Sequence, residues 1–152
     1  MKKWASLVGW IALSLGAGIF GSQFQPGTWY EALNRPPWTP PNWLFGPVWT
    51  TLYVLMGVAA WRIWVRRSEE GTGWALGLFV AQLVLNALWS WIFFGLHLTG
   101  FAAIEIVILL VAIILTTITF WKTDRPAGLL LVPYIVWVSY ASALNISIWM
   151  RN

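Results

Sequence analysis

The chain has 152 residues, of which 59% are hydrophobic and only 9% are charged, and its mean hydropathy is +0.71. A soluble domain devotes about a quarter of its residues to charge, so this composition excludes an ordinary soluble protein and indicates a membrane protein. The lack of cysteine in the sequence excludes disulfides and thiolate chemistry, and the net charge of +4 is too small to indicate nucleic-acid binding.

Five apolar stretches predict an all-α membrane protein, a bundle of five transmembrane helices. Each stretch is long enough to cross about 30 Å as a helix, and none alternates with period two as a barrel strand does. The predicted spans cover residues of about 4–22, 44–65, 74–95, 99–121 and 128–150. They form a single domain over 1–152 and leave no room for a soluble catalytic domain.

The connection over residues 23–43 differs from the others. It reads QFQPGTWYEALNRPPWTPPNW, with five prolines and three tryptophans. The proline pairs fix φ and bias the residues before them to extended conformations. A stiff surface linker is one interpretation, but a long loop so rich in aromatic residues is more typical of a structured functional segment. We therefore expect a lid over one mouth of the bundle.

The third span carries two separate stripes. Gly77 and Ala81 stand one turn apart and continue a small-residue pattern that lets another helix approach closely. Gln82, Asn86 and Trp89 lie on another face, displaced by about 140°. Because amides avoid lipid, this second face should point into the bundle. The small stripe then faces another subunit or a neighbouring span of the same chain.

Aromatic residues recur at helical spacing on two further spans. Trp49 and Tyr53 are one turn apart on the second span, and Trp137 lies beside a face with Ala141 and Asn145 on the fifth. Such stripes often reflect ordinary packing, but three polar and aromatic faces in one small bundle favour a binding cavity. The sequence shows no paired carboxylates, Ser–His–Asp set or phosphate loop, and one histidine without cysteine predicts no metal site.

Glu105 is the only acid within a predicted span. Its carboxylate could extend back to the lipid headgroups, or it could pair with Arg35 or an interior hydroxyl. The sequence leaves both interpretations open.

Basic residues gather at one end of the predicted bundle. Seven of the nine lie there, and only Arg35 and Arg151 lie at the other end. The positive-inside rule therefore predicts a cytoplasmic N-terminus, with the lid and the C-terminus outside. The first span follows two lysines but is too long for a signal-peptide core and lacks a convincing cleavage motif, so we expect it to be retained. The bacterial cell membrane is the expected location.

Several sequence blocks stand out together. They are WYEALNRPPWTPP from Trp29, GPVWTTLYVLMG from Gly46, QLVLNALWSWIFFG from Gln82, VPYIVW from Val132 and ASALN from Ala141. Together these blocks extend over essentially the whole chain and strongly resemble the tryptophan-rich sensory protein/translocator protein family (TspO/MBR, the peripheral benzodiazepine receptor family).

The resemblance implies a five-helix bundle, commonly a homodimer, that binds tetrapyrroles such as protoporphyrin IX and haem. Family members also bind isoquinoline carboxamide and benzodiazepine drugs, and animal members bind cholesterol. The animal cholesterol motif requires a basic residue soon after a tyrosine, and here Tyr140 is followed by ASALN. Carried over by position, the ligand contacts are Trp38, Trp49, Asn86, Trp89, Trp137, Ala141 and Leu144. Trp49 and Trp137 match tryptophans implicated in light-dependent porphyrin degradation in some bacterial members.

The residue types at these positions suit a porphyrin ligand. Trp49, Trp89 and Trp137 could stack on a porphyrin, and we add Tyr53 and Asn145 to the expected ligand contacts. Arg35 in the lid is a candidate partner for the propionates. We expect no obligatory cofactor, and a site better suited to metal-free porphyrin than to haem. A porphyrin-binding sensor or carrier, a porphyrin-degrading enzyme and a membrane scaffold with a Gly77–Ala81 dimer interface all remain open.

Overall fold

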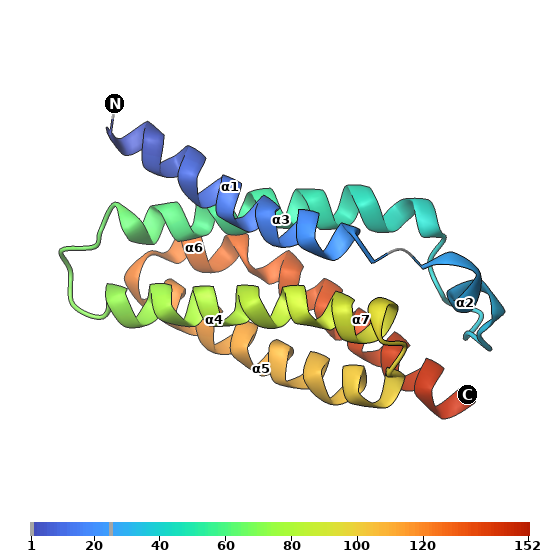
Figure 1. Cartoon of the computed structure of the whole chain (residues 1–152). Coiled ribbons are helices and arrows are strands. Elements are labelled where there is room, and N and C mark those ends of the chain that lie inside the picture. Colours follow the sequence, from blue (N-terminus) through green and yellow to red (C-terminus); the bar gives the residue numbers. More distant parts are fainter. Residues whose placement is uncertain (1, 25) are drawn as a thin grey trace.

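A computed structural model describes residues 2–24 and 26–152, and every regular element within these ranges is a helix. Five segments are long and apolar enough to span a membrane (Figure 1). They are Lys2–Ser22 (α1), Asn42–Trp64 (α3), Thr72–Gly95 (α4, Thr72–Ser90, with η1, Trp91–Gly95), Thr99–Thr123 (α5) and Arg125–Arg151 (α6, Arg125–Leu130, with α7, Val132–Arg151). The predicted all-α bundle of five spans is confirmed, and the chain is an integral, multi-pass membrane protein.

The long helices run side by side, and α1 crosses the outside of the bundle (Figure 1). Helix α1 packs on α3 and α4, whereas α5 packs on α4, α6 and α7. At the crossing of α1 and α3, a Cβ atom added to Gly57 would lie 2.5 Å from the Ile11 Cα atom. The two backbones therefore touch at a position where only glycine fits.

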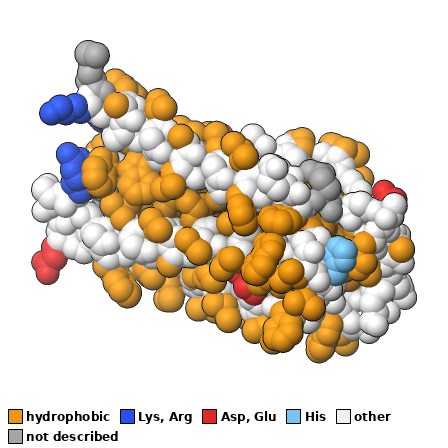
Figure 2. All heavy atoms as spheres, in the orientation of Figure 1, with side chains coloured by type: hydrophobic (Ala, Val, Ile, Leu, Met, Phe, Trp, Pro, Cys, Tyr) orange, Lys and Arg blue, Asp and Glu red, His pale blue; other side chains and the backbone are white. Residues whose placement is uncertain are grey.

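The interior contains two clusters of buried side chains. The larger one joins α3, α4, α5 and α7 through residues such as Met56, Phe79 and Ile113. The smaller one, with Tyr30 and Phe93, lies beneath the lid. Hydrophobic side chains also cover the outside of the molecule along its length (Figure 2). An apolar exterior over an apolar core is the pattern that a bilayer, rather than water, stabilises.

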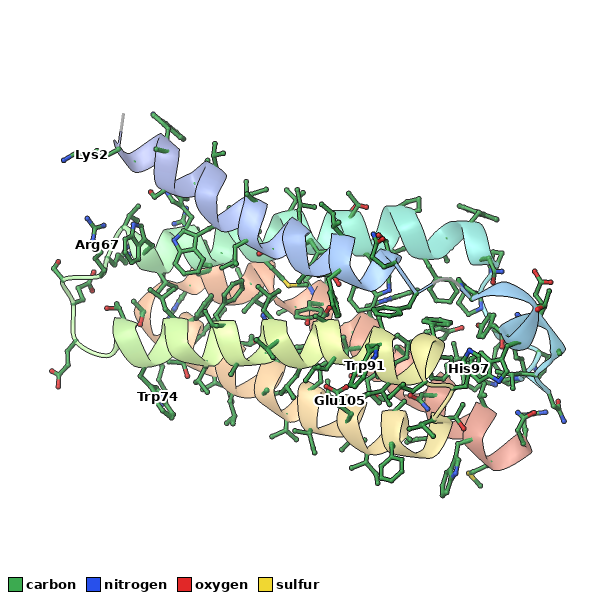
Figure 3. All side chains as sticks on the ribbon, viewed as in Figure 1. Lys2, Arg67, Trp74, Trp91, His97 and Glu105 are labelled. Carbon is green, nitrogen blue, oxygen red and sulfur yellow. The ribbon has the colours of Figure 1, made fainter. Side chains whose placement is uncertain are left out.

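The connection between α1 and α3 is a structured cover over one end of the bundle. It contains a short helix, α2 (Gly27–Ala32), followed by extended chain. The Trp29 ring stacks on His97, with centroids 3.9 Å apart, and Figure 3 places His97 at this end. The Asn34 N–H donates to Asn152 Oδ1 at 3.1 Å, and the Tyr140 hydroxyl donates to the Trp38 carbonyl. These contacts hold the lid against the corner that follows η1 and against the C-terminal part of α7.

Two spans depart from regular α-helix. The third ends in the π-helix η1, where the Leu96 N–H donates to the Trp91 carbonyl at 2.8 Å. Such wide turns occur frequently at functional sites. The fifth span is interrupted at Leu131, two residues before Pro133, whose ring nitrogen cannot donate a helix hydrogen bond.

Candidate functional site

A cavity of about 500 Å³ lies beneath the lid. This volume is within the range of roughly 300–1,000 Å³ that is usual for small-molecule sites. The walls come from α1, the lid, α3, α4, η1 and α7. The aromatic lining residues are Phe24, Tyr30, Trp43, Phe45, Trp49, Tyr53, Trp89, Phe93, Phe94 and Trp137.

The structure brings most of the sequence-predicted site residues together around this cavity. Those that line it are Trp49, Tyr53, Trp89, Trp137, Ala141, Leu144 and Asn145. Trp49 stacks on Tyr53, with ring centroids 5.6 Å apart, and stands nearly perpendicular to Trp137 at 6.3 Å. Trp89 stacks on Phe93 at 5.1 Å. The cavity therefore presents both faces and edges of indole rings to a ligand.

A buried chain of hydrogen bonds holds the Tyr53 side of the wall. The Tyr53 hydroxyl donates to Asn86 Oδ1 at 2.5 Å, and Asn86 Nδ2 donates to the Tyr134 hydroxyl at 2.8 Å. The Tyr134 hydroxyl in turn donates to Gln82 Oε1 at 2.7 Å. The chain ties α3, α4 and α7 together in an apolar interior, where such networks fix one arrangement. Asn86 thus lies behind the cavity wall.

A second pair of bonds holds the opposite wall. Trp89 Nε1 donates to Asn145 Oδ1 at 2.9 Å, and Asn145 Nδ2 donates to the Thr99 carbonyl at 2.9 Å. Asn145 therefore connects α7 to α4 and to the first turn of α5. These bonds fix the plane of the Trp89 ring.

Trp38 and Arg35 do not line the cavity. Trp38 is 43% exposed and packs against Tyr140, with ring centroids 5.5 Å apart. Arg35 lines a polar hollow in the lid, and its guanidinium carbon lies 4.7 Å from the centroid of the Tyr30 ring. Tyr30 itself lines the cavity, so Arg35 is separated from it by one ring.

Two donors in the cavity wall lack a hydrogen-bond partner among the described residues: the Tyr30 hydroxyl and Trp137 Nε1. Tyr30 lies in the lid, where burial raises the pKa of its hydroxyl and the nearby Arg35 guanidinium partly offsets this effect. Tyr30 therefore stays a neutral donor at physiological pH. A buried donor without a partner is destabilising by about 1–3 kcal/mol, and both atoms are buried rather than exposed to the cavity.

Sequence reasoning missed the contribution of α1. Gly18 and Gly21 line the cavity, and a Cβ atom added to Gly18 would lie 2.5 Å from the Tyr53 ring. The run GAGIFG near the end of the first span was the available signal, because closely spaced glycines in a membrane helix indicate close approach. Tyr30 and Phe94 were also not anticipated as lining residues.

Glu105 forms neither of the contacts considered for it. Both carboxylate oxygens are buried and lack a hydrogen-bond partner within residues 2–24 and 26–152. Arg35 stacks on Tyr30 instead.

The cavity lining contains few side chains of the types that bind haem iron. Of these types, the lining contains tyrosine (Tyr30 and Tyr53) but no histidine, cysteine or methionine. No group of three or more potential metal-ligating side chains occurs in the described part of the chain.

Five membrane spans around an aromatic cavity define a polytopic membrane protein with an internal cavity of the size usual for small-molecule sites. A sequence model of the TspO/MBR family matches residues 10–150, and the chain belongs to this family.

Several relatives match nearly the full length. The tryptophan-rich protein TspO of Chlorobaculum tepidum is 43% identical over 152 residues, which cover 93% of this chain and 92% of the relative. Protein CrtK of Rhodobacter capsulatus is 42% identical over 137 residues, with 90% and 86% covered. The translocator protein of Homo sapiens is 36% identical over 155 residues, with 98% and 91% covered.

Proposed function

We propose that this protein binds porphyrins and related flat apolar ligands in its internal cavity, as a sensor or carrier that regulates tetrapyrrole metabolism or transport. The observation that carries the proposal is a cavity of about 500 Å³ walled by Trp49, Trp89 and Trp137. The family resemblance implies tetrapyrroles, and the relatives include a tryptophan-rich sensory protein and a translocator protein.

Each part of the site has a role in this proposal. The indole faces of Trp49, Trp89 and Trp137 stack on the macrocycle. Arg35 lies one ring outside the cavity, where it is the candidate partner for a propionate near water. Protoporphyrin IX is the preferred candidate, because the cavity lining contains no histidine, cysteine or methionine to bind haem iron.

Titration of tryptophan fluorescence with protoporphyrin IX in the dark tests the proposal. We expect each of the changes Trp49→Phe and Trp137→Phe to weaken the affinity obtained from the saturable quenching by about 2- to 10-fold. The reason is that a stacked aromatic pair contributes about 0.5–1.5 kcal/mol. Trp74→Phe is the matched control, since Trp74 is 70% exposed on the outside of α4. Quenching that never saturates and is the same in the parent and all three variants would indicate that porphyrin partitions into detergent, and it would refute a specific site.

A light-dependent porphyrin-degrading activity is the second candidate. It is favoured by the placement of Trp49 and Trp137 in one cavity, with ring centroids 6.3 Å apart. The two indoles would act as redox partners of an illuminated porphyrin, with dioxygen as the oxidant. The protein under light should then form product with first-order kinetics, and loss of either indole should stop it. Bleaching at the rate of free porphyrin would argue against this activity.

We also propose a homodimer formed through α4. Gly77 and Ala81 are exposed, and a Cβ atom added to Gly77 would meet nothing within 4 Å. No described helix of the same chain covers this stripe, which favours a second subunit over internal packing.

A further inference from the structure

The end of the bundle opposite the lid carries three cations that each lie over an indole ring. The pairs, with the distance from the cation to the ring centroid, are Lys3 and Trp61 (5.6 Å), Arg67 and Trp64 (4.6 Å), and Arg125 and Trp121 (5.5 Å). These distances are typical of cation–π contacts. The rings come from α3 and α5, and the cations come from α1, the α3–α4 connection and α6.

The three cations have no acidic partner in the part of the chain that the structure describes. Arg62 and Arg66, at the same end, both approach Asp124, at 2.6 and 3.5 Å. Lys3, Arg67 and Arg125 are exposed and form no such pair. Their positive charge is therefore available to an external anion.

Charge and aromatic residues together indicate what that anion is. Seven of the nine basic residues and three of the five acids lie at this end, so it carries a net charge of +4 and the rest of the chain carries none. Figure 2 shows the Lys and Arg side chains gathered there, and Figure 3 places Lys2 and Arg67 at that end. Trp4 and Trp121 are 61% and 43% exposed beside the cations, as residues of a membrane–water interface are.

We infer that Lys3, Arg67 and Arg125 form a binding surface for the headgroups of anionic phospholipids in the adjoining leaflet. The indole rings sit at the level of the interface and hold each cation where lipid phosphates lie. Because the ring already restricts the side chain, less conformational entropy is lost when a headgroup binds. A nucleic acid would gain nothing from the exposed apolar surface beside these charges, whereas a lipid covers it with its acyl chains.

Lipid enrichment around the full chain tests the inference. The protein is reconstituted in nanodiscs of phosphatidylcholine mixed with phosphatidylglycerol, and the lipids retained on it are measured by native mass spectrometry. Arg67→Gln should lower the preference for phosphatidylglycerol about fivefold, and the triple change Lys3→Gln, Arg67→Gln, Arg125→Gln about a hundredfold. Arg151→Gln is the matched control, because Arg151 lies at the lid end and has no acidic partner among the described residues.

The outcomes separate the alternatives. A loss of the preference for phosphatidylglycerol with Arg67→Gln but not with Arg151→Gln supports the proposed surface. The single change tests the inference even if the triple variant does not fold. Equal effects of both changes would overturn the inference, because the lipid preference would then depend on net charge alone. No effect of either change would also overturn it, because the preference would then not depend on these charges. Inorganic phosphate added to the detergent-solubilised protein should leave its melting temperature unchanged. A rise as large as that caused by phosphatidylglycerol would indicate a simple anion site and refute the lipid assignment.

Discussion

Gly18 determines where the Tyr53 ring can lie in the cavity wall. A Cβ atom at this position would approach two carbons of that ring to 2.5 and 2.7 Å, closer than van der Waals contact permits. Tyr53 cannot move freely in response, because its hydroxyl donates to the buried Asn86. The absence of a side chain on α1 therefore shapes the cavity.

Gly18→Ala should weaken both folding and ligand binding. Overpacking is destabilising by about 1–3 kcal/mol, which exceeds the gain of about 0.5–1 kcal/mol that alanine brings to a helix. Thermal unfolding in detergent and protoporphyrin titration measure the two effects.

Gly16→Ala provides the control for this change. Gly16 lies on the same helix, and an added Cβ atom would meet nothing within 4 Å. This variant should be as stable as the parent or more stable by about 0.5–1 kcal/mol, with unchanged binding. If the two variants behave alike, the Tyr53 contact does not limit the cavity.

The sequence predicted some residues of the site better than others, for physical reasons. Trp49, Tyr53 and Trp137 lie on helix faces that helical spacing and the family blocks both indicate. Tyr30 reaches the cavity only because the lid folds back over the bundle, which no periodicity encodes. Asn86 faces inward as predicted, yet its amide is used by Tyr53 and Tyr134 behind the wall.

At the scale of elements, Asp124 joins three parts of the fold. Its carboxylate accepts a hydrogen bond from Arg62 at 2.6 Å, lies 3.5 Å from Arg66, and accepts from the Ala127 N–H at the start of α6. Burial alone would raise the pKa of Asp124. The hydrogen bonds and positive charges of these partners outweigh it and hold this pKa below its usual range.

The lowered pKa predicts a loss of stability in acid. A carboxyl with a depressed pKa stabilises the folded state above its unfolded value of about 4, and this contribution disappears as the pH falls through the folded value. Asp124→Asn should lose about 1–2 kcal/mol at neutral pH, because Arg62 is partly exposed and its bond is screened. Melting temperatures from pH 7 down to about 3 should converge for parent and variant.

Glu69→Gln is the comparison for Asp124→Asn. Glu69 pairs with Arg66 at 3.5 Å, and both side chains are exposed, so its loss should leave the acid dependence unchanged. An Asp124→Asn protein that still loses stability in acid as the parent does would place the responsible carboxyl elsewhere.

The exposed stripe on α4 predicts the dimer contact. Gly77→Leu would place a bulky side chain on a surface that we propose is covered by a second copy, so the dimer should dissociate. Mass in detergent, measured by light scattering, reports the result. Gly9→Leu is the control, because Gly9 is exposed on α1 and also has no neighbour within 4 Å. A dimer that survives Gly77→Leu would place the interface on another face.

The third and fifth spans show the limits of reading elements from the sequence. The residues WIFFG continue an apolar run without interruption, so nothing local distinguishes the π-turn of η1 from α-helix. Tertiary contacts decide it, because the wide turn lets both Phe93 and Phe94 line the cavity. The break at Leu131 was easier to anticipate, since Pro133 cannot donate a helix hydrogen bond.

At the scale of the whole molecule, the two ends of the bundle have different properties. The lid end carries the cavity and almost no net charge, whereas the opposite end carries most of the basic residues. Composition and charge were sufficient to predict the bundle and this asymmetry, because the bilayer constrains both strongly. The cavity depends on ring packing between helices, which the sequence alone does not specify.

This asymmetry predicts the orientation in a bacterial cell membrane, and the lack of native cysteine makes the test clean. Glu31 in the lid and Glu70 in the α3–α4 connection are both exposed, at opposite ends. Acidic residues contribute little to topology, so replacing either one by cysteine should leave the orientation unchanged. A membrane-impermeant maleimide should label Glu31→Cys in intact cells, and Glu70→Cys only after the membrane is permeabilised. The reverse pattern would place the N-terminus outside. Labelling of both variants in intact cells would mean that the chain inserts in two orientations, and the basic end would then not determine the direction of insertion.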